Sequence, residues 1–334
     1  MTTAVATLHA PTLHIAGGEI WLRCPECALG LGLIRDGDDS SSGTWIRCQG
    51  CEAVVQKKDG IWRVLSRHQR ARFSSFLRDY EDIRRREGRG SVHGAFYLGL
   101  PYADLTGKFR EQWHIRGRSY RFIETQLLPE LEERHGQGFR ALDIGAGNGW
   151  LSYRLALLGH RPAAVDLCCN AWDGLAAGEH YASVLPAMFP RFEAEMDALP
   201  FEDAQFDVAI FNASFHYSTD YARTLRETLR CLRPGGTVLI VDSPTYARAH
   251  SGEAMRMERR LQFEAKFGTR GDALPTGDFI TPGILDNLGS LGIRWKRHLA
   301  WYGLRWWMRP WMARMKGRRE PSQFYLYEGQ TELL

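Results

Sequence analysis

The sequence lacks any uninterrupted run of about 18 apolar residues, the length that a membrane-spanning helix requires. Its first residues, MTTAVATLHAPTLHIAGG, contain neither a charged start nor a continuous apolar core. They therefore predict neither a secretory signal peptide nor a transit peptide. Internal repeats and low-complexity tracts are missing as well. We expect a cytoplasmic protein of ordinary globular composition with no transmembrane segment.

A strong excess of charge of one sign is also missing. Lys and Arg total 43 against 39 for Asp and Glu, which leaves a formal net charge of +4. Domains that bind nucleic acid usually carry a larger basic excess, so any such role would have to come from a local cluster. The 334 residues exceed the length of one ordinary domain, and we therefore expect two units with separate cores.

Cysteine is scarce, but four of the seven cysteines lie near the N-terminus as two CxxC pairs. Cys24 and Cys27 form the first pair, and Cys48 and Cys51 form the second, a spacing typical of zinc ribbons. Four thiolates fill a tetrahedral shell, so we predict a structural rather than a catalytic zinc ion. Two disulfides or free thiols are the alternative, and a reducing compartment disfavours the disulfides. A segment this small needs the metal for stability.

The order of apolar and polar residues divides the rest of the chain. Residues 67–90 are Arg-rich, with Phe73, Phe76, Leu77 and Tyr80 at helical spacing, which predicts an amphipathic connecting helix. A second helical stretch is expected from about residue 109 to residue 133. The predicted units are a flexible N-terminus (1–18), a zinc ribbon (19–66), a helical connector (67–108) and a large domain (109–334).

From residue 139 onward, short apolar runs alternate with longer helical ones. This alternation is typical of βαβ units, so we predict an α/β fold with a doubly wound, mostly parallel sheet. Two late runs would add an antiparallel pair at the sheet edge. The expected strands are 140–144, 163–167, 192–196, 206–211, 237–241, 293–301 and 324–327.

A glycine-rich turn, LDIGAGNGW, ends the first of these strands and opens a helix at Trp150. Glycines allow the backbone to turn tightly and to approach a ligand closely. The GxGxG spacing, preceded by Asp143, departs from the GxGxxG spacing of dinucleotide-binding enzymes. A carboxylate at this place suits a ligand with an ammonium group better than a pyrophosphate.

Polar residues also follow the next three strands, and open α/β sheets bind ligands at these carboxyl ends. Asp166 ends the second strand, where a carboxylate accepts both hydroxyls of a ribose. Asp197 ends the third strand, within reach of an adenine amino group. Asn212 and His216 follow the fourth.

In this order and spacing the motifs closely resemble the class I S-adenosylmethionine (SAM)-dependent methyltransferases, in particular the broad branch that includes quinone-biosynthesis methyltransferases. The resemblance covers roughly residues 113–243. It implies SAM as the cofactor, a seven-stranded sheet and a methyltransferase domain over 109–334. By resemblance, Gly145, Gly147 and Gly149 line the methionine end, Asp166 the ribose, and Asp197, Ala198 and Leu199 the adenine. Asp143, Ala146, Asn148, Leu167 and Asn212 complete the predicted cofactor-binding set.

Two flanking segments resemble parts of related proteins. Upstream, Trp113 and Arg116 lie where this branch often has a helix that covers the cofactor, and they would contact the methionine carboxylate or the substrate. An ordinary packing helix with a solvated Arg face is the alternative. Residues 54–65, after the second CxxC pair, resemble the small zinc-ribbon proteins that activate methyltransferases.

Methyl transfer from a sulfonium needs alignment more than acid–base help, because the leaving group is a neutral thioether. A base is required only when the acceptor must first lose a proton. His216 is the first candidate, followed by Tyr217 and His114. For each histidine, a purely structural role is the alternative.

The segment from Arg294 to Arg319 contains nine Lys or Arg residues and five Trp residues but no acid. This mixture is typical of an anionic membrane surface, of stacking on RNA bases, or of an aromatic wall over a small acceptor. We therefore favour a methyltransferase for a small apolar or aromatic acceptor, with a lipid-linked one included. An RNA methyltransferase that grips RNA with its zinc ribbon is the first alternative, and a non-catalytic SAM-binding scaffold is the second.

Overall fold

The computed structural model describes residues 13–15, 18–31 and 45–331. Our expectation of a flexible segment over 1–18 therefore falls mostly outside the described residues. Within it, β1 (Leu13–Ile15) pairs antiparallel with β2 (Gly18–Ile20).

The predicted doubly wound sheet is confirmed. Its seven strands run in the order β12-β14-β10-β9-β6-β7-β8, as part of a larger sheet. Strands β6 to β10 are parallel, and β12 and β14 form the expected antiparallel pair at the edge. The strands are β6 (Arg140–Ile144), β7 (Arg161–Asp166), β8 (Arg191–Glu193), β9 (Phe206–Asn212), β10 (Leu232–Val241), β12 (Ile293–His298) and β14 (Leu326–Thr331). Strand β11 (Pro244–Thr245) pairs separately with β13 (Gln323–Phe324).

Helices cover both faces of the sheet, because successive strand residues point to opposite sides. Ala141 and Val208 pack on one face, and their neighbours Leu142 and Ala209 pack on the other. One face is covered by α2 (Gly94–Gly99), α3 (Arg110–Phe122), α4 (Leu128–His135) and α5 (Trp150–Leu157). The other is covered by α6 (Tyr221–Cys231) and α8 (Pro282–Gly289). A π-helical turn (Ile123–Leu127) and two 3₁₀ turns (Leu175–Ser183 and Phe215–Tyr217) complete the covering.

The N-terminal ribbon is a continuation of the central sheet. Strands β3 (Trp45–Arg47), β4 (Val54–Lys58) and β5 (Ile61–Arg63) form an antiparallel meander, and β5 pairs parallel with β8. Ile20 and Leu22 also join the buried cluster on one face of the sheet. Our expectation of separate cores is therefore wrong, because the ribbon extends the seven strands to a sheet of ten.

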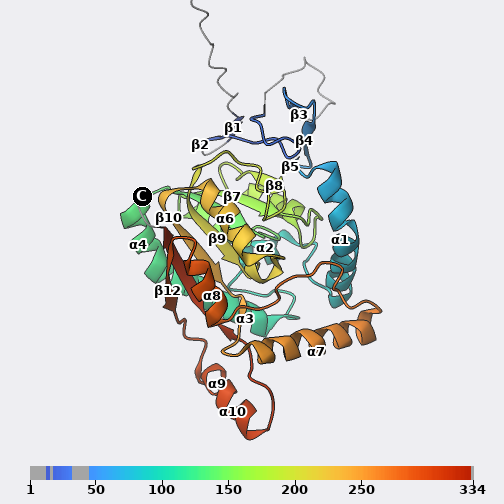
Figure 1. The fold of residues 1–334 in the computed structure, drawn as a ribbon, viewed down its shortest axis with the longest axis vertical. Coiled ribbons are helices and arrows are strands. Elements are labelled where there is room, and N and C mark those ends of the chain that lie inside the picture. Colours follow the sequence, from blue (N-terminus) through green and yellow to red (C-terminus); the bar gives the residue numbers. More distant parts are fainter. Residues whose placement is uncertain (1–12, 16–17, 32–44, 332–334) are drawn as a thin grey trace, which may run out of the picture.

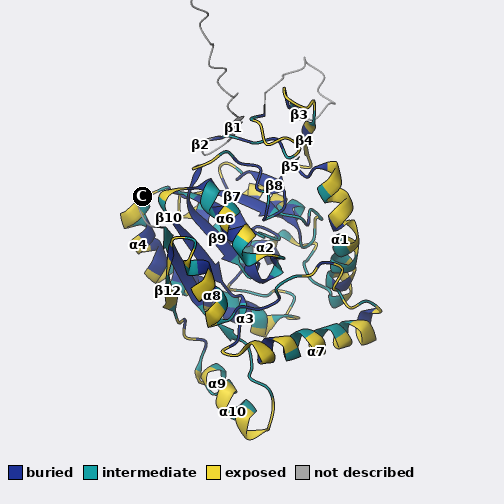
Figure 2. Cartoon of the chain, viewed as in Figure 1, coloured by how far each residue is buried: buried dark blue, intermediate teal, exposed yellow. Residues whose placement is uncertain are grey.

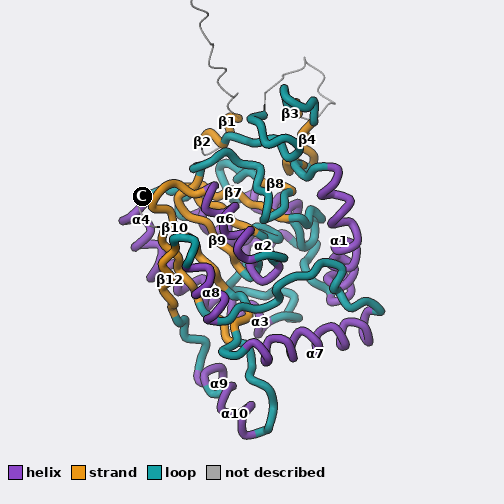
Figure 3. The backbone as a smooth tube through the Cα atoms, viewed as in Figure 1, coloured by secondary structure: helices purple, strands orange, loops and turns teal. Residues whose placement is uncertain are grey.

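The connecting helix α1 (Arg67–Glu87) lies alongside the sheet (Figures 1 and 3). Ser66 caps it: its Oγ accepts a hydrogen bond from the Gln69 amide, and its own amide donates to Gln69 Oε1. Gly88, in the left-handed conformation at φ 75°, ends it. Arg70 binds Glu193 at the end of β8 at 3.1 Å, which fixes the helix against the strand.

Two outlying elements follow the parallel strands. Helix α7 (Ala249–Phe267) runs along the edge of the molecule and approaches the end of α1, where Arg86 Nη1 donates to the Phe267 carbonyl at 2.7 Å. Helices α9 (Leu304–Trp307) and α10 (Arg309–Met315) project from the body, and much of their surface is exposed (Figure 2). Among the described residues, none of the helices combines the length and hydropathy that a membrane span needs.

The shared sheet predicts cooperative unfolding of the ribbon and the large domain. Ile61 of β5 is fully buried, so Ile61→Ala should lower the free energy of unfolding by about 2 to 5 kcal/mol. Calorimetry should show one transition shifted as a whole. Val54→Ala, at a half-exposed position on β4, is the control and should shift it little. Two transitions, with the upper one unchanged by Ile61→Ala, would contradict the shared core.

Candidate cofactor cavity and cysteine cluster

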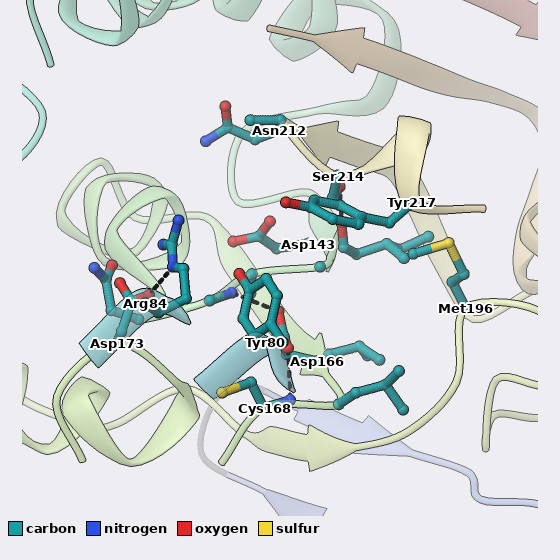
Figure 4. A pocket seen from close by; sticks show the side chains of 18 of the residues that line it. Tyr80, Arg84, Asp143, Asp166, Cys168, Asp173, Met196, Asn212, Ser214 and Tyr217 are labelled. Carbon is teal, nitrogen blue, oxygen red and sulfur yellow. Dashed lines mark hydrogen bonds and ion pairs between the residues drawn. The ribbon is translucent and has the colours of Figure 1, made fainter. Parts of the chain in front are cut away.

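A cavity opens at the carboxyl ends of the parallel strands, between the sheet, α1 and α3 (Figure 4). Its lining combines the glycine-rich turn with the polar strand ends, as the sequence predicts. The predicted residues that line it are Trp113, Arg116, Asp143, Gly145, Ala146, Gly147, Asn148, Asp166, Leu167, Asp197, Asn212 and Tyr217.

The glycine-rich turn has a backbone that only glycine adopts easily. Gly145 and Gly147 have φ angles of 74° and 55°. A Cβ on Gly145 would lie 2.3 Å from the Cβ of Ser214, so a side chain there would clash. Gly149, at φ 75°, begins α5 and does not line the cavity.

Asp166 is oriented by the backbone around it. Its Oδ2 accepts a hydrogen bond from the Gly147 amide at 2.8 Å, and its Oδ1 accepts one from the Cys168 amide at 2.7 Å. Burial raises the pKa of this carboxyl above its ordinary value. The carboxylate is thus held rigidly at the end of β7, and it also ties the glycine-rich turn to that strand.

Asp143 is buried beneath the turn with one oxygen unused. Its Oδ2 accepts a hydrogen bond from Ser152 Oγ at 2.8 Å, whereas its Oδ1 has no partner among the described residues. Burial raises the pKa of Asp143 to about 7. An unpaired buried carboxylate oxygen is costly unless a ligand supplies a donor or a positive charge.

At the third strand end the structure places only part of the predicted adenine set in the cavity. Asp197 lines it and accepts hydrogen bonds from the hydroxyls of Thr224 and Thr219. Ala198 and Leu199 do not line it, since the chain turns away and the Leu199 amide donates to Glu227. Met196, which follows β8, and Leu167, which follows β7, instead provide apolar surface to the cavity.

Arg116 reaches the cavity from α3 without a charged partner in contact. Its guanidinium lies over the Trp113 ring, 4.8 Å from the centroid, and forms no hydrogen bond or ion pair within the described parts of the chain. Burial lowers its pKa, against the opposing influence of Asp242. The group is therefore available to an anionic part of a ligand.

The two predicted histidines are not brought to the cavity. His114 lies on the exposed side of α3. His216 is buried, with Nδ1 3.4 Å from Ser243 Oγ, and burial lowers its pKa to about 3. Neither lines the cavity, so Tyr217 is the one predicted base candidate that does.

The wall formed by α1 was missed from the sequence. Phe73, Phe76, Leu77 and Tyr80 line the cavity, and the Tyr80 ring meets the Tyr217 ring edge-on at 6.1 Å. Their helical spacing is the signal in the sequence, and it predicts the helix but not that the helix faces a cavity. Nearby, Arg84 Nε binds Asp173 Oδ2 at 2.5 Å (Figure 4).

The four N-terminal cysteines converge as predicted. Their sulfurs lie within 4.8 Å of one another, and none forms a disulfide. Cys24 and Cys51 are 3.5 Å apart, as are Cys27 and Cys48. Sulfurs around a tetrahedral zinc, with Zn–S bonds of about 2.3 Å, lie roughly 3.8 Å apart, so the cluster fits such an ion.

Part of the chain is similar in sequence to known methyltransferases. Residues 142–240 match the family model described as a methyltransferase domain. Over 106 residues the chain is 34% identical to a malonyl-[acyl-carrier protein] O-methyltransferase of Erwinia pyrifoliae, a match that covers 32% of this chain and 38% of that protein. A ubiquinone/menaquinone biosynthesis C-methyltransferase of Cereibacter sphaeroides is 25% identical over 159 residues, 47% of this chain and 60% of that protein. The chain thus spans about two fifths to three fifths of these relatives' lengths.

One solved structure aligns with a larger share of the chain than these relatives do, but at lower sequence identity. The 1,6-didemethyltoxoflavin-N1-methyltransferase of Burkholderia thailandensis is 16% identical, with a TM-score of 0.45, over 85% of this chain and 97% of that one. The family match spans the turn after β6 and the strand ends of β7, β8 and β9, which form the sheet side of the cavity, whereas α1 and α3 lie outside the match. Residues 142–240 therefore match a methyltransferase domain, and the two relatives above that are similar to this part of the chain are named methyltransferases.

Proposed function

We propose that the protein transfers a methyl group from SAM to a small apolar or aromatic acceptor. The observation that carries the proposal is the unpaired oxygen of Asp143 at the base of a cavity that also contains the fixed carboxylate of Asp166. Bound SAM would supply a methyl group on a positively charged sulfonium. The ammonium of its methionine part suits Asp143, and its ribose hydroxyls suit Asp166.

The remaining lining groups suit the other ends of the same molecule. Arg116, which has no anionic partner in contact, would hold the methionine carboxylate. Leu167 and Met196 would pack against the adenine faces, and Asp197 would accept from its amino group. The chain's own contribution is then mainly positioning and exclusion of water, which is sufficient for transfer from a sulfonium.

The acceptor would enter between α1 and α7. A second hollow there shares Phe76, Tyr80 and Tyr217 with the cofactor cavity, and it continues to Ile83 and Phe263. The aromatic and aliphatic side chains favour an apolar or aromatic acceptor, and the hollow is also lined by charged side chains, namely Asp79, Arg84, Glu87, Arg89 and Arg259. Of the three base candidates only Tyr217 lines both spaces, so any proton transfer by a predicted base would involve it.

An RNA acceptor is less well supported, because the arginines of the connector are engaged within the protein. Arg70 and Arg72 bind Glu193 and Glu195, and Arg84 binds Asp173. Few arginines of the connector helix are therefore free to bind the phosphates of an RNA backbone. We propose that the partner of the segment 294–319 is an anionic membrane surface, because this segment combines nine basic residues and five Trp residues with no acid. A non-catalytic scaffold would not need the second hollow beside the cofactor cavity.

We also propose that Cys24, Cys27, Cys48 and Cys51 hold one structural zinc ion. The Glu26 amide donates to Cys24 Sγ, and the Gly50 amide donates to Cys48 Sγ, both at 3.4 Å, which would stabilise thiolates. All four ligand positions are sulfur, so no position is open for catalysis. Thiolates of this kind persist in a reducing compartment, and we therefore place the protein in the cytoplasm.

The cofactor assignment can be tested at Asp166. Asp166→Ala should weaken binding of S-adenosylhomocysteine by about 1 to 3 kcal/mol, because its ribose hydroxyls lose their acceptor. Asp220→Ala is a matched control: Asp220 also accepts from two backbone amides, at the start of α6, but does not line the cavity. Calorimetric titration that finds equal affinity for wild type and Asp166→Ala would refute the assignment.

The zinc site predicts an effect beyond the ribbon. Purified protein should contain about one zinc per chain, and Cys48→Ser should lose it. Since β5 belongs to the central sheet and Glu26 accepts from the Arg67 amide of α1, metal loss should lower both Tm and affinity for S-adenosylhomocysteine. Cys231→Ser, at a buried thiol outside the cluster, should leave the zinc content unchanged. Protein prepared under reducing conditions without zinc would exclude the site.

The acceptor class is tested by incubating the enzyme with labelled SAM and either total RNA or a small-molecule and lipid extract. We expect label in the extract, identified by mass spectrometry, and less label with Asp166→Ala at a donor concentration that does not saturate the variant. Phe263→Ala, which enlarges the second hollow, should raise KM for the acceptor while leaving donor affinity unchanged. Label confined to RNA would overturn the small-acceptor proposal.

A further inference from the structure

The arm formed by α9 and α10 carries an apolar face that no described part of the chain covers. Trp307 is 66% exposed and Trp311 is 62% exposed. Leu304 and Met315 are exposed as well. Large side chains rarely gather on an exposed surface unless it meets an apolar partner.

The opposite face of the arm is packed against the body, so the arm is held in a fixed orientation. The Trp306 ring stacks on Phe324 with centroids 5.5 Å apart. Just before α9, the Tyr302 hydroxyl lies 2.9 Å from Ser119 Oγ of α3. The exposed rings are therefore presented outward by a fixed support.

The charges around this face are basic. Arg305, Arg314, Lys316 and Arg318 are exposed, and no ion pair engages them within the described ranges. No acidic residue lies between Arg294 and Arg319. Exposed Trp beside unneutralised basic side chains is the pattern of an element that sits at the headgroup level of an anionic bilayer.

A groove beside the arm is lined partly by basic side chains. It lies between α10, the start of β11 and α7, and its lining includes Tyr246, Glu258, Arg309, Lys316 and Arg319. Glu258 is engaged by Arg319, at 2.7 Å. Arg309 stacks on Trp306, and its buried Nη1 has no hydrogen-bond partner in the described structure. Arg309 and Lys316 both line this groove, and two basic side chains suit a phosphate group.

We propose that the α9–α10 arm docks on an anionic phospholipid bilayer, with Trp307 and Trp311 in the interface and one headgroup phosphate in the Arg309 groove. The inference rests on the membrane partnership proposed above and adds to it the inserted face and the headgroup site. Docking of this kind would bring a lipid-linked acceptor to the enzyme.

The test measures co-sedimentation of the full chain with vesicles, alongside affinity for S-adenosylhomocysteine. Wild type should bind vesicles of phosphatidylcholine mixed with phosphatidylglycerol, and binding should weaken as salt rises. Trp307→Ala with Trp311→Ala should weaken binding even at low salt, because ring burial is not screened. Met257→Ala with Leu261→Ala, at two exposed apolar positions of α7, is the control and should have little effect.

The groove is tested separately by charge. Arg309→Gln with Lys316→Gln should weaken binding by more than the roughly 25-fold expected for loss of two surface charges near the membrane. Arg223→Gln with Arg226→Gln removes two charges from the exposed surface of α6 and should change binding little. At matched surface potential, wild type should prefer phosphatidic acid over phosphatidylglycerol, and the groove variant should lose this preference.

Each outcome has a distinct meaning. A groove variant that keeps the preference for phosphatidic acid removes the headgroup site. Absence of vesicle binding, or RNA binding that is tighter than vesicle binding and falls with Trp307→Ala and Trp311→Ala, overturns bilayer docking. Since donor affinity is measured in parallel, failure of docking with normal donor binding leaves the methyltransferase proposal standing.

Discussion

The parallel pairing of β5 with β8 is the contact on which the rest of the architecture depends. It makes a small cysteine-rich module the outer part of the central sheet. It also sets the starting point of α1, which follows β5 directly and is tied to β8 through Arg70 and Glu193. The cysteine cluster and the wall of the cavity are therefore both attached to the same sheet, the first through β5 and the second through α1.

The position of α1 against the sheet determines what its arginines contact. Its arginines look free in the sequence, but most face carboxylates or carbonyl groups once the helix lies against the sheet. Arg86 contacts the Phe267 carbonyl, and Arg84 contacts Asp173. The apolar stripe of the same helix, with Phe76 and Tyr80, then faces the cavity. One helix thus closes the cofactor space and bounds the hollow proposed for the acceptor.

The cavity and the arm place different demands on their side chains. In the cavity, Asp143 Oδ1 is withdrawn from water without a partner, and the Arg116 guanidinium has no ion-pair partner among the described residues, so a bound ligand could satisfy both. On the arm, large aromatic rings are exposed to solvent, and this exposure is less costly when an apolar partner covers them. Both features are costs within the isolated chain, and both point to what the chain binds.

The sequence by itself determined the elements whose signals are local. The alternation of short apolar and longer helical runs predicted a mostly parallel sheet, the GxGxG turn and the polar strand ends predicted the edge where the cavity opens, and the CxxC spacing predicted the cysteine cluster. Only the tertiary structure decided that the ribbon shares the sheet, that α1 forms a cavity wall, and that His216 is buried away from the site. These outcomes depend on contacts between residues far apart in the chain, such as Ile61 with Arg191, and periodicity within one segment carries no information about such contacts.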